Sequence, residues 1–88
     1  MQRNNRILIV DDELSMLFVL RETLEQGDFD VVEAEDGEKA LEVFATHKPD
    51  LVLLDVYMPC MDGFEACRRI RSMQGGQTVP IVIITGDE

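Results

Sequence analysis

The chain has 88 residues, 45% of them hydrophobic and 30% charged, as is usual for one small globular domain. Its longest apolar runs are too short to span a membrane, and its polar start shows no secretory signal. The formal net charge of −10 argues against nucleic acid or an anionic membrane as a partner of this domain. These features predict a cytoplasmic protein in which Cys60 and Cys67 are free thiols.

Short aliphatic runs alternate along the chain with segments of helical periodicity. The runs are expected to form strands at 6–10, 29–33, 51–54 and 80–84. After the first run, apolar residues recur at helical spacing, and Gly27 supplies a helix stop: Leu14, Leu17, Phe18 and Leu24. The segment 34–37 is expected to be a turn before the next helix.

Two further helices are predicted from the same kind of pattern. Ala40, Leu41 and Phe44 mark the buried stripe of the second, which the segment 48–50 ends. The third is expected to begin near Asp62, a favourable N-cap residue. The order β-α-β-α-β-α-β predicts an α/β domain with a doubly wound parallel sheet and right-handed crossovers.

Small polar or acidic residues follow three of the four predicted strands. Asp11 and Asp12 follow the first, Asp55 the third and Thr85 the fourth. Asp55 or Thr85 alone is explained by a turn, a helix cap or a strand end, whereas the adjacent carboxylates of Asp11 and Asp12 call for a further reason. Together they lie where open α/β sheets bind ligands, at the carboxyl ends of the strands. Clustered carboxylates repel one another unless a cation intervenes, and oxygen ligands suit Mg²⁺. The pattern therefore predicts an acidic Mg²⁺ site.

Three segments of the chain resemble the receiver domain of two-component response regulators, the CheY-like family. They are ILIVDDE at 7–13, DLVLLDVYMPCMDG at 50–63 and PIVIITG at 80–86. The resemblance covers essentially the whole chain, and the spacing of the Asp, Met-Pro and Asp-Gly elements in the second segment is specific. It implies a flavodoxin-like receiver fold.

The resemblance also implies a role for each residue of the acidic pocket. Asp55 would accept a phosphoryl group from a histidine kinase or phosphotransfer protein. Asp12 would ligate Mg²⁺ directly, Asp11 would act through a metal-bound water, and Tyr57 would contribute its main-chain carbonyl. Such a domain is a signalling switch and not an enzyme with turnover on a metabolite.

Residues near the phosphoryl group would control the switch. By the same resemblance, Thr85 would hydrogen-bond a phosphoryl oxygen and move inward on phosphorylation. Tyr57 and Asp87 each lie two residues after a site residue, and in the family those positions influence how fast the phosphoryl group is lost.

The end of the sequence departs from the family pattern. A complete receiver has five βα units with strand order 2-1-3-4-5. The chain is therefore expected to be a partial receiver, residues 1–88, truncated after the fourth strand. The fourth helix, fifth strand and fifth helix would be absent, together with a phosphoryl-pairing Lys. We expect impaired phosphorylation and self-association through the exposed fourth strand.

Two other functions remain open from the sequence. An Mg²⁺-dependent phosphohydrolase could also use an Asp nucleophile on a parallel sheet, although such enzymes usually carry a second Asp at the position of Tyr57. A pseudo-receiver that only binds partners is the other alternative, although the acidic residues Asp11, Asp12 and Asp55 that such proteins typically lose are all present.

Overall fold

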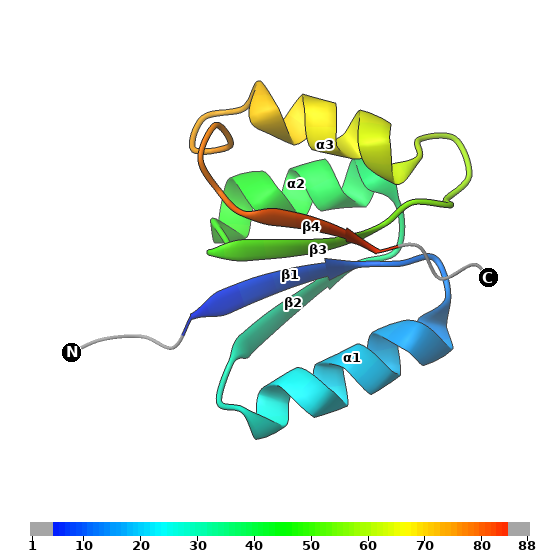
Figure 1. Ribbon diagram of the computed structural model, residues 1–88, viewed down its shortest axis with the longest axis vertical. Helices are drawn as coiled ribbons and strands as arrows, with labels where there is room; N and C mark the ends of the chain where they lie inside the picture. The colour runs from blue at the N-terminus through cyan, green and yellow to red at the C-terminus, as the bar shows by residue number, and fades with distance from the viewer. Residues whose placement is uncertain (1–4, 85–88) are drawn as a thin grey trace.

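The computed structural model describes residues 5–84, which form a parallel four-stranded sheet and three helices (Figure 1). In chain order the elements are β1 (Arg6–Val10), α1 (Leu14–Gln26), β2 (Asp30–Ala34), α2 (Gly37–His47), β3 (Leu51–Asp55), α3 (Gly63–Arg71) and β4 (Ile81–Ile84). The strand order is β2-β1-β3-β4, with all pairs parallel. The predicted α/β class, parallel sheet and element order are confirmed.

A few element boundaries differ from the sequence prediction. β2 begins one residue later than predicted, and Gly37 is the first residue of α2 and not the end of a turn. β4 begins at Ile81, because Pro80 contributes only its carbonyl, which accepts a hydrogen bond from Val52 N–H at 3.0 Å. The expected N-cap of α3 is confirmed, since Asp62 Oδ1 accepts from the N–H of Glu65 at 2.9 Å.

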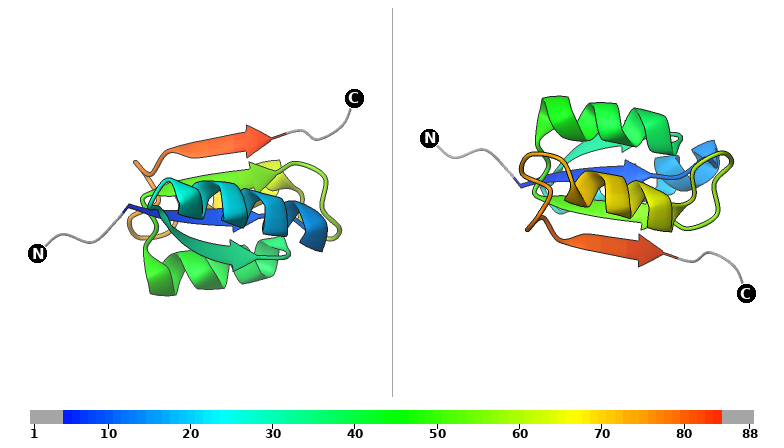
Figure 2. Two further views of the ribbon diagram at one scale, coloured as in Figure 1. Left: turned by 90° about the horizontal axis from the view of Figure 1, so that it is seen from below. Right: turned by 90° about the horizontal axis from the view of Figure 1, so that it is seen from above.

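The sheet lies between two helical layers, with α1 on one face and α2 and α3 on the other (Figures 1 and 2). β1 lies inside the sheet, and its residues after Arg6 are all apolar because both faces of the strand are covered. Leu8 and Val10 belong to the core beneath α2 and α3, whereas Ile7 and Ile9 pack with Leu17 of α1. Two separate apolar cores therefore hold β1 in place.

Helical spacing identified α1 but not its buried face. Leu17 is buried and Leu24 packs against the core, whereas Leu14 and Phe18 are 67% and 63% exposed. Phe64 at the start of α3 is also largely exposed. Within residues 5–84, no helix combines the length and the apolar character needed to cross a membrane.

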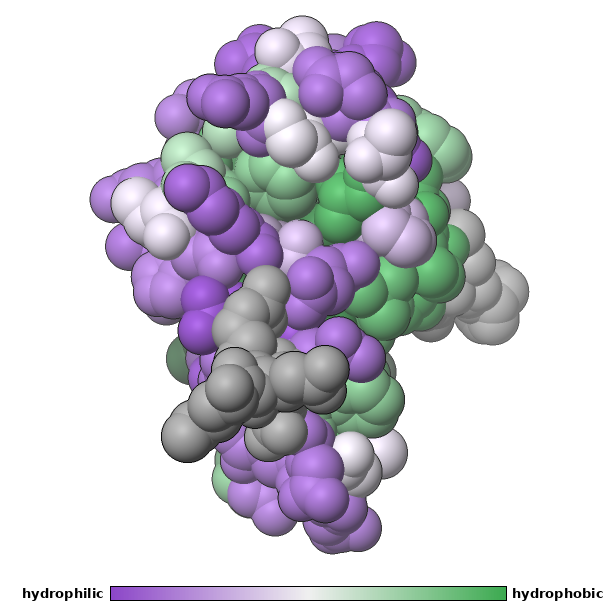
Figure 3. All heavy atoms as spheres, turned by 90° about the vertical axis from the view of Figure 1, so that its left-hand side faces the viewer, coloured by the Kyte–Doolittle hydropathy of each residue, from purple (hydrophilic) through white to green (hydrophobic). Residues whose placement is uncertain are grey.

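The two edges of the sheet differ in chemistry. On β2, Asp30 and Glu33 form ion pairs with Arg6 and Arg21. β4 contains only aliphatic residues, and in the described part of the chain its hydrogen-bonded neighbour is β3 alone. Figure 3 shows an apolar area on its right-hand side, where β4 forms the edge. An aliphatic edge strand favours pairing with another strand.

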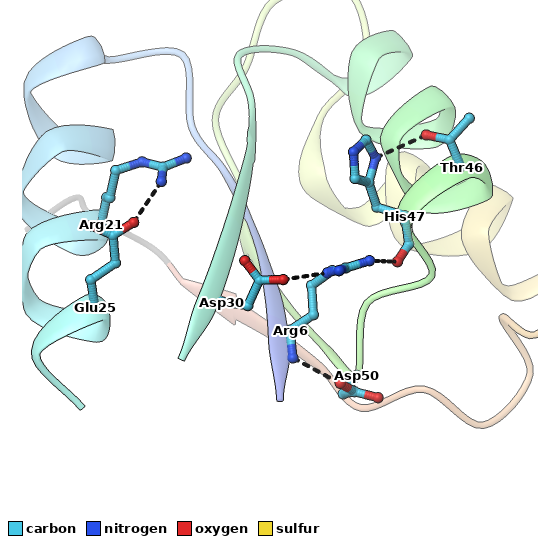
Figure 4. Close-up of polar contacts among 7 residues, drawn as sticks. All are labelled: Arg6, Arg21, Glu25, Asp30, Thr46, His47 and Asp50. Carbon is cyan, nitrogen blue, oxygen red and sulfur yellow. Dashed lines mark hydrogen bonds and ion pairs between the residues drawn. The ribbon is translucent and has the colours of Figure 1, made fainter. Parts of the chain in front are cut away.

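Arg6 connects three chain segments at the amino ends of the strands (Figure 4). Its Nε donates to Asp30 Oδ2 at 2.7 Å, and its Nη1 donates to the carbonyl oxygen of His47 at 2.7 Å. Its main-chain N–H donates to Asp50 Oδ2 at 2.8 Å. One half-buried residue thus joins β1 to β2, to the end of α2 and to the start of β3.

Candidate metal-binding site

Three aspartates meet at the carboxyl edge of the sheet. β1 and β3 are adjacent and in register, with Val10 opposite Leu54, so the residues that follow them lie side by side. One carboxylate oxygen from each of Asp11, Asp12 and Asp55 lies within 4.8 Å of the others. Asp11 and Asp55 are half-buried and Asp12 is exposed. The predicted convergence of these three residues is confirmed.

Main-chain hydrogen bonds hold the segment around Asp11. Its N–H donates to the carbonyl of Ala34 at 3.2 Å, which continues the pairing of β1 with β2. Its Oδ1 accepts from the N–H of Glu13 at 2.9 Å, which fixes the side chain beside the start of α1. Asp11 is therefore oriented by backbone groups on both sides.

The end of β3 is held by β4 and by the loop that follows β3. Val56 N–H donates to the carbonyl of Ile84 at 3.2 Å, and Gly63 N–H donates to the carbonyl of Val56 at 2.8 Å. Met58 and Met61 of the same loop are buried in the core. These contacts turn the chain back toward the sheet. Asp55 is therefore held at a strand end that is fixed by hydrogen bonds and by buried side chains.

The electrostatics of the cluster favour a bound cation. Burial raises the pKa of Asp55, and the negative charge of Asp11 and then of Asp12 raises it further. Hydrogen bonding from the backbone at Tyr57 and Val56 opposes this pKa rise. The crowded carboxylates offer hard oxygen ligands and stand to gain from neutralisation, so they fit Mg²⁺.

The other three predicted site residues are Tyr57, which the structure describes, and two that it does not describe. Tyr57 lies in the loop after Asp55 and is 62% exposed, and the role of its main-chain carbonyl as a metal ligand stays a prediction. Thr85 and Asp87 lie outside the described residues.

One feature that supports the site had no signal in the sequence. A Cβ added at Gly37 would lie 2.6 Å from Met61 Sδ and 2.9 Å from Met61 Cβ. The start of α2 is therefore packed closely against the loop after β3. The two residues are far apart in the chain and belong to no shared motif. Only the packing of α2 against that loop brings them together.

The fold is thus a parallel α/β sheet with a cluster of three aspartates at its carboxyl edge. The response regulator receiver domain family matches residues 7–88. The chain belongs to this family, whose members are signalling modules.

Individual relatives agree with this assignment. The chain is 42% identical over 85 residues to the alkaline phosphatase synthesis transcriptional regulatory protein PhoP of Bacillus subtilis, a match that covers 97% of this chain but 35% of PhoP. The chain thus spans about a third of the length of the curated relatives it matches. It superimposes on the chemotaxis protein CheY4 of Vibrio cholerae with a TM-score of 0.92 and 30% identity, covering 97% of this chain and 71% of CheY4.

A third relative was solved with a metal ion. The receiver domain of the sensor histidine kinase PA1611 from Pseudomonas aeruginosa has a magnesium ion coordinated in its active-site cleft. The chain matches it with a TM-score of 0.90 and 30% identity, covering 96% of this chain and 69% of that one. The acidic triad of Asp11, Asp12 and Asp55 is typical of the Mg²⁺ site of receivers.

Proposed function

We propose that Asp55 accepts a phosphoryl group from a histidine kinase or phosphotransfer protein in a Mg²⁺-dependent reaction that switches an output. The observation that carries this proposal is the position of Asp55. It is half-buried at the end of β3, with two further carboxylates beside it. Membership of the receiver family supports the same function.

The chemistry follows from the groups at the site. A carboxylate oxygen of Asp55 attacks phosphorus, a phosphorus–oxygen bond forms, and the phosphorus–nitrogen bond of the donor phosphohistidine breaks with its electron pair leaving on the imidazole. Since a carboxylate is a weak nucleophile, positioning by β3 must supply much of the rate. Asp12, Asp55 and the Tyr57 carbonyl would hold Mg²⁺, with Asp11 acting through water. Bound Mg²⁺ would offset the negative charge that accumulates during transfer.

Three further roles rest on motif position alone. We assign Thr85 as the hydroxyl that hydrogen-bonds a phosphoryl oxygen. We assign Tyr57 and Asp87 as residues that tune the lifetime of the acyl phosphate. Replacement of Thr85 by Val would test the first role through the change in phosphorylated lifetime, and a lifetime equal to that of the parent chain would refute it.

Mass spectrometry after incubation with acetyl phosphate and Mg²⁺ tests the central proposal. The chain should gain the mass of one phosphoryl group, and Asp55→Asn should abolish the gain. Asp28→Asn is the matched control, because Asp28 is exposed and lies outside the carboxylate cluster. An adduct that survives Asp55→Asn, or no adduct on the parent chain, contradicts the proposal. Continuous phosphate release over many turnovers indicates a phosphohydrolase instead.

We also propose that residues 1–88 alone react more slowly than longer receivers. The family's phosphoryl-pairing Lys has no counterpart among these residues, so one positive charge is missing from the transfer site. The rate of phosphorylation by acetyl phosphate, measured beside CheY4 of Vibrio cholerae, tests this. Equal rates would refute it.

The aliphatic edge of β4 supports a proposal about assembly. We infer that the 88-residue chain self-associates through β4, where Val82 is 48% and Ile84 is 39% exposed. Light scattering at micromolar concentration should give a mass above that of the monomer, and Val82→Lys should restore the monomer. Val19→Lys is the control, because Val19 is also exposed but lies on α1. A monomeric parent chain would refute the inference.

A further inference from the structure

A hollow of about 410 Å³ lies between the carboxyl-terminal end of α2 and the segment that follows α3. One side is formed by Phe44, Ala45, Lys48 and Pro49, and the other by residues 73–75. Both segments lie at the amino ends of the strands, on the left of Figure 1, whereas the aspartate cluster follows the carboxyl ends of β1 and β3. The hollow is therefore separate from the proposed phosphoacceptor site.

Most of the lining is apolar. Phe44 is only 4% exposed and belongs to the core, and Pro49 is buried beside it. Ala45 and Met73 complete the apolar surface, with Met73 packed against the same core. The volume lies within the range of small-molecule pockets, and an apolar lining with a few polar groups is typical of them. This surface fits a compact hydrocarbon or aromatic group.

Within residues 5–84, the lining contains one charged residue, the basic Lys48. Lys48 is the C-cap residue of α2 in the left-handed conformation, and its N–H donates to the carbonyl of Phe44 at 3.1 Å. Gln74 and Gly75 complete the polar part of the lining, and none of the described lining residues is acidic. The positive charge of Lys48 at this hollow, with no acidic residue among the described lining residues, favours an anion.

We propose that this hollow binds a small amphipathic monocarboxylate. The apolar body of the ligand packs against Phe44 and Met73, and its carboxylate pairs with the ammonium group of Lys48. A charge-assisted hydrogen bond of this kind is stronger than a neutral one, which makes the acid the preferred ligand over its amide. Simple inorganic anions leave the apolar surface uncovered and bind more weakly.

The test uses 3-phenylpropionate as the probe and its neutral analogue 3-phenylpropanamide for comparison. Titration followed by ¹⁵N–¹H chemical shifts should give saturable changes at Ala45, Lys48 and Gly75. The acid should bind about tenfold more tightly than the amide, as one charge-assisted contact implies. Equal affinities for acid and amide, or shifts scattered over the surface, overturn the proposal.

Three variants sharpen the test. Lys48→Gln should weaken binding of the acid to the level of the amide. Lys39→Gln, on the same helix but paired with Glu42 outside the hollow, should leave binding unchanged. Ala45→Phe should fill the hollow and abolish binding of both probes, while the shifts caused by Mg²⁺ near Asp55 persist and show that the fold is intact. Unchanged affinity for the acid in Lys48→Gln or in Ala45→Phe refutes the proposal.

Discussion

The α-carbon of Gly63 faces the main-chain carbonyl of Asp55 so closely that a Cβ at position 63 would overlap with that carbonyl oxygen. Gly63 N–H also donates to the carbonyl of Val56 at 2.8 Å. The first residue of α3 is therefore packed directly on the end of β3. This contact sets the path of the chain on both sides of the candidate phosphoacceptor.

Replacement of Gly63 by Ala should destabilise the chain and displace Asp55. Overpacking of this kind typically costs about 1–3 kcal/mol, because the backbone on one side must shift. Urea unfolding monitored by circular dichroism measures the loss, and Mg²⁺ titration should show weaker binding. Gly27→Ala is the matched control, since its Cβ would meet a Phe29 ring carbon at 3.3 Å and its φ is −93°. Equal unfolding midpoints for the two variants would contradict the contact.

Asp55→Asn should stabilise the metal-free chain at neutral pH. Burial and the neighbouring Asp11 raise the pKa of Asp55 above its ordinary value. The folded state then holds this proton more tightly than the unfolded state, so stability falls as pH rises through the folded pKa. The parent chain should lose more stability than Asp55→Asn between pH 4 and pH 7, roughly the range above an ordinary carboxyl pKa.

Magnesium should reverse the order of the two proteins. Mg²⁺ that binds the folded parent chain raises its melting temperature by mass action, whereas Asp55→Asn lacks one of the carboxylates and gains less. Differential scanning fluorimetry with and without Mg²⁺ measures both effects. If Asp55→Asn melts below the parent chain in EDTA at pH 7, the electrostatic account of the cluster is wrong.

Arg6→Met should lower stability by about 1–2 kcal/mol, because it removes hydrogen bonds to Asp30 and to the carbonyl of His47 in a half-buried setting. A double-mutant cycle with Asp30→Asn isolates the side-chain pair, and a coupling energy near zero would show that the ion pair contributes nothing. Arg68→Met is the comparison. Arg68 pairs with Glu65 on an exposed helix face, so its replacement should cost much less stability than that of Arg6.

Asp62→Ala should cost about 1 kcal/mol, because it removes the side-chain acceptor that caps α3. Asp62→Asn retains an acceptor and should lose much less. Chemical denaturation of both variants separates the cap from the charge. If the Asn variant is as unstable as the Ala variant, the negative charge at the helix start matters more than the hydrogen bond.

Much of the fold was predictable from local patterns. The aliphatic run of β1 and the helical spacing after it reflect the periodicity that each element imposes on its buried side chains. The N-cap at Asp62 was equally predictable from the sequence, because capping depends on a neighbour only three residues away. Burial on helix faces was not, because Leu14 and Leu17 have the same local spacing and differ only in what lies opposite them.

The sequence by itself determined the order of the elements and the presence of carboxylates after two strands that a parallel sheet brings together. The tertiary structure decided which groups meet. It placed Arg6 against Asp30 and His47, and it formed the hollow beside Lys48. It also buried Asp55 near other carboxylates, and both effects raise the pKa of Asp55. These features depend on distances between segments remote in the chain, and no local periodicity encodes such distances.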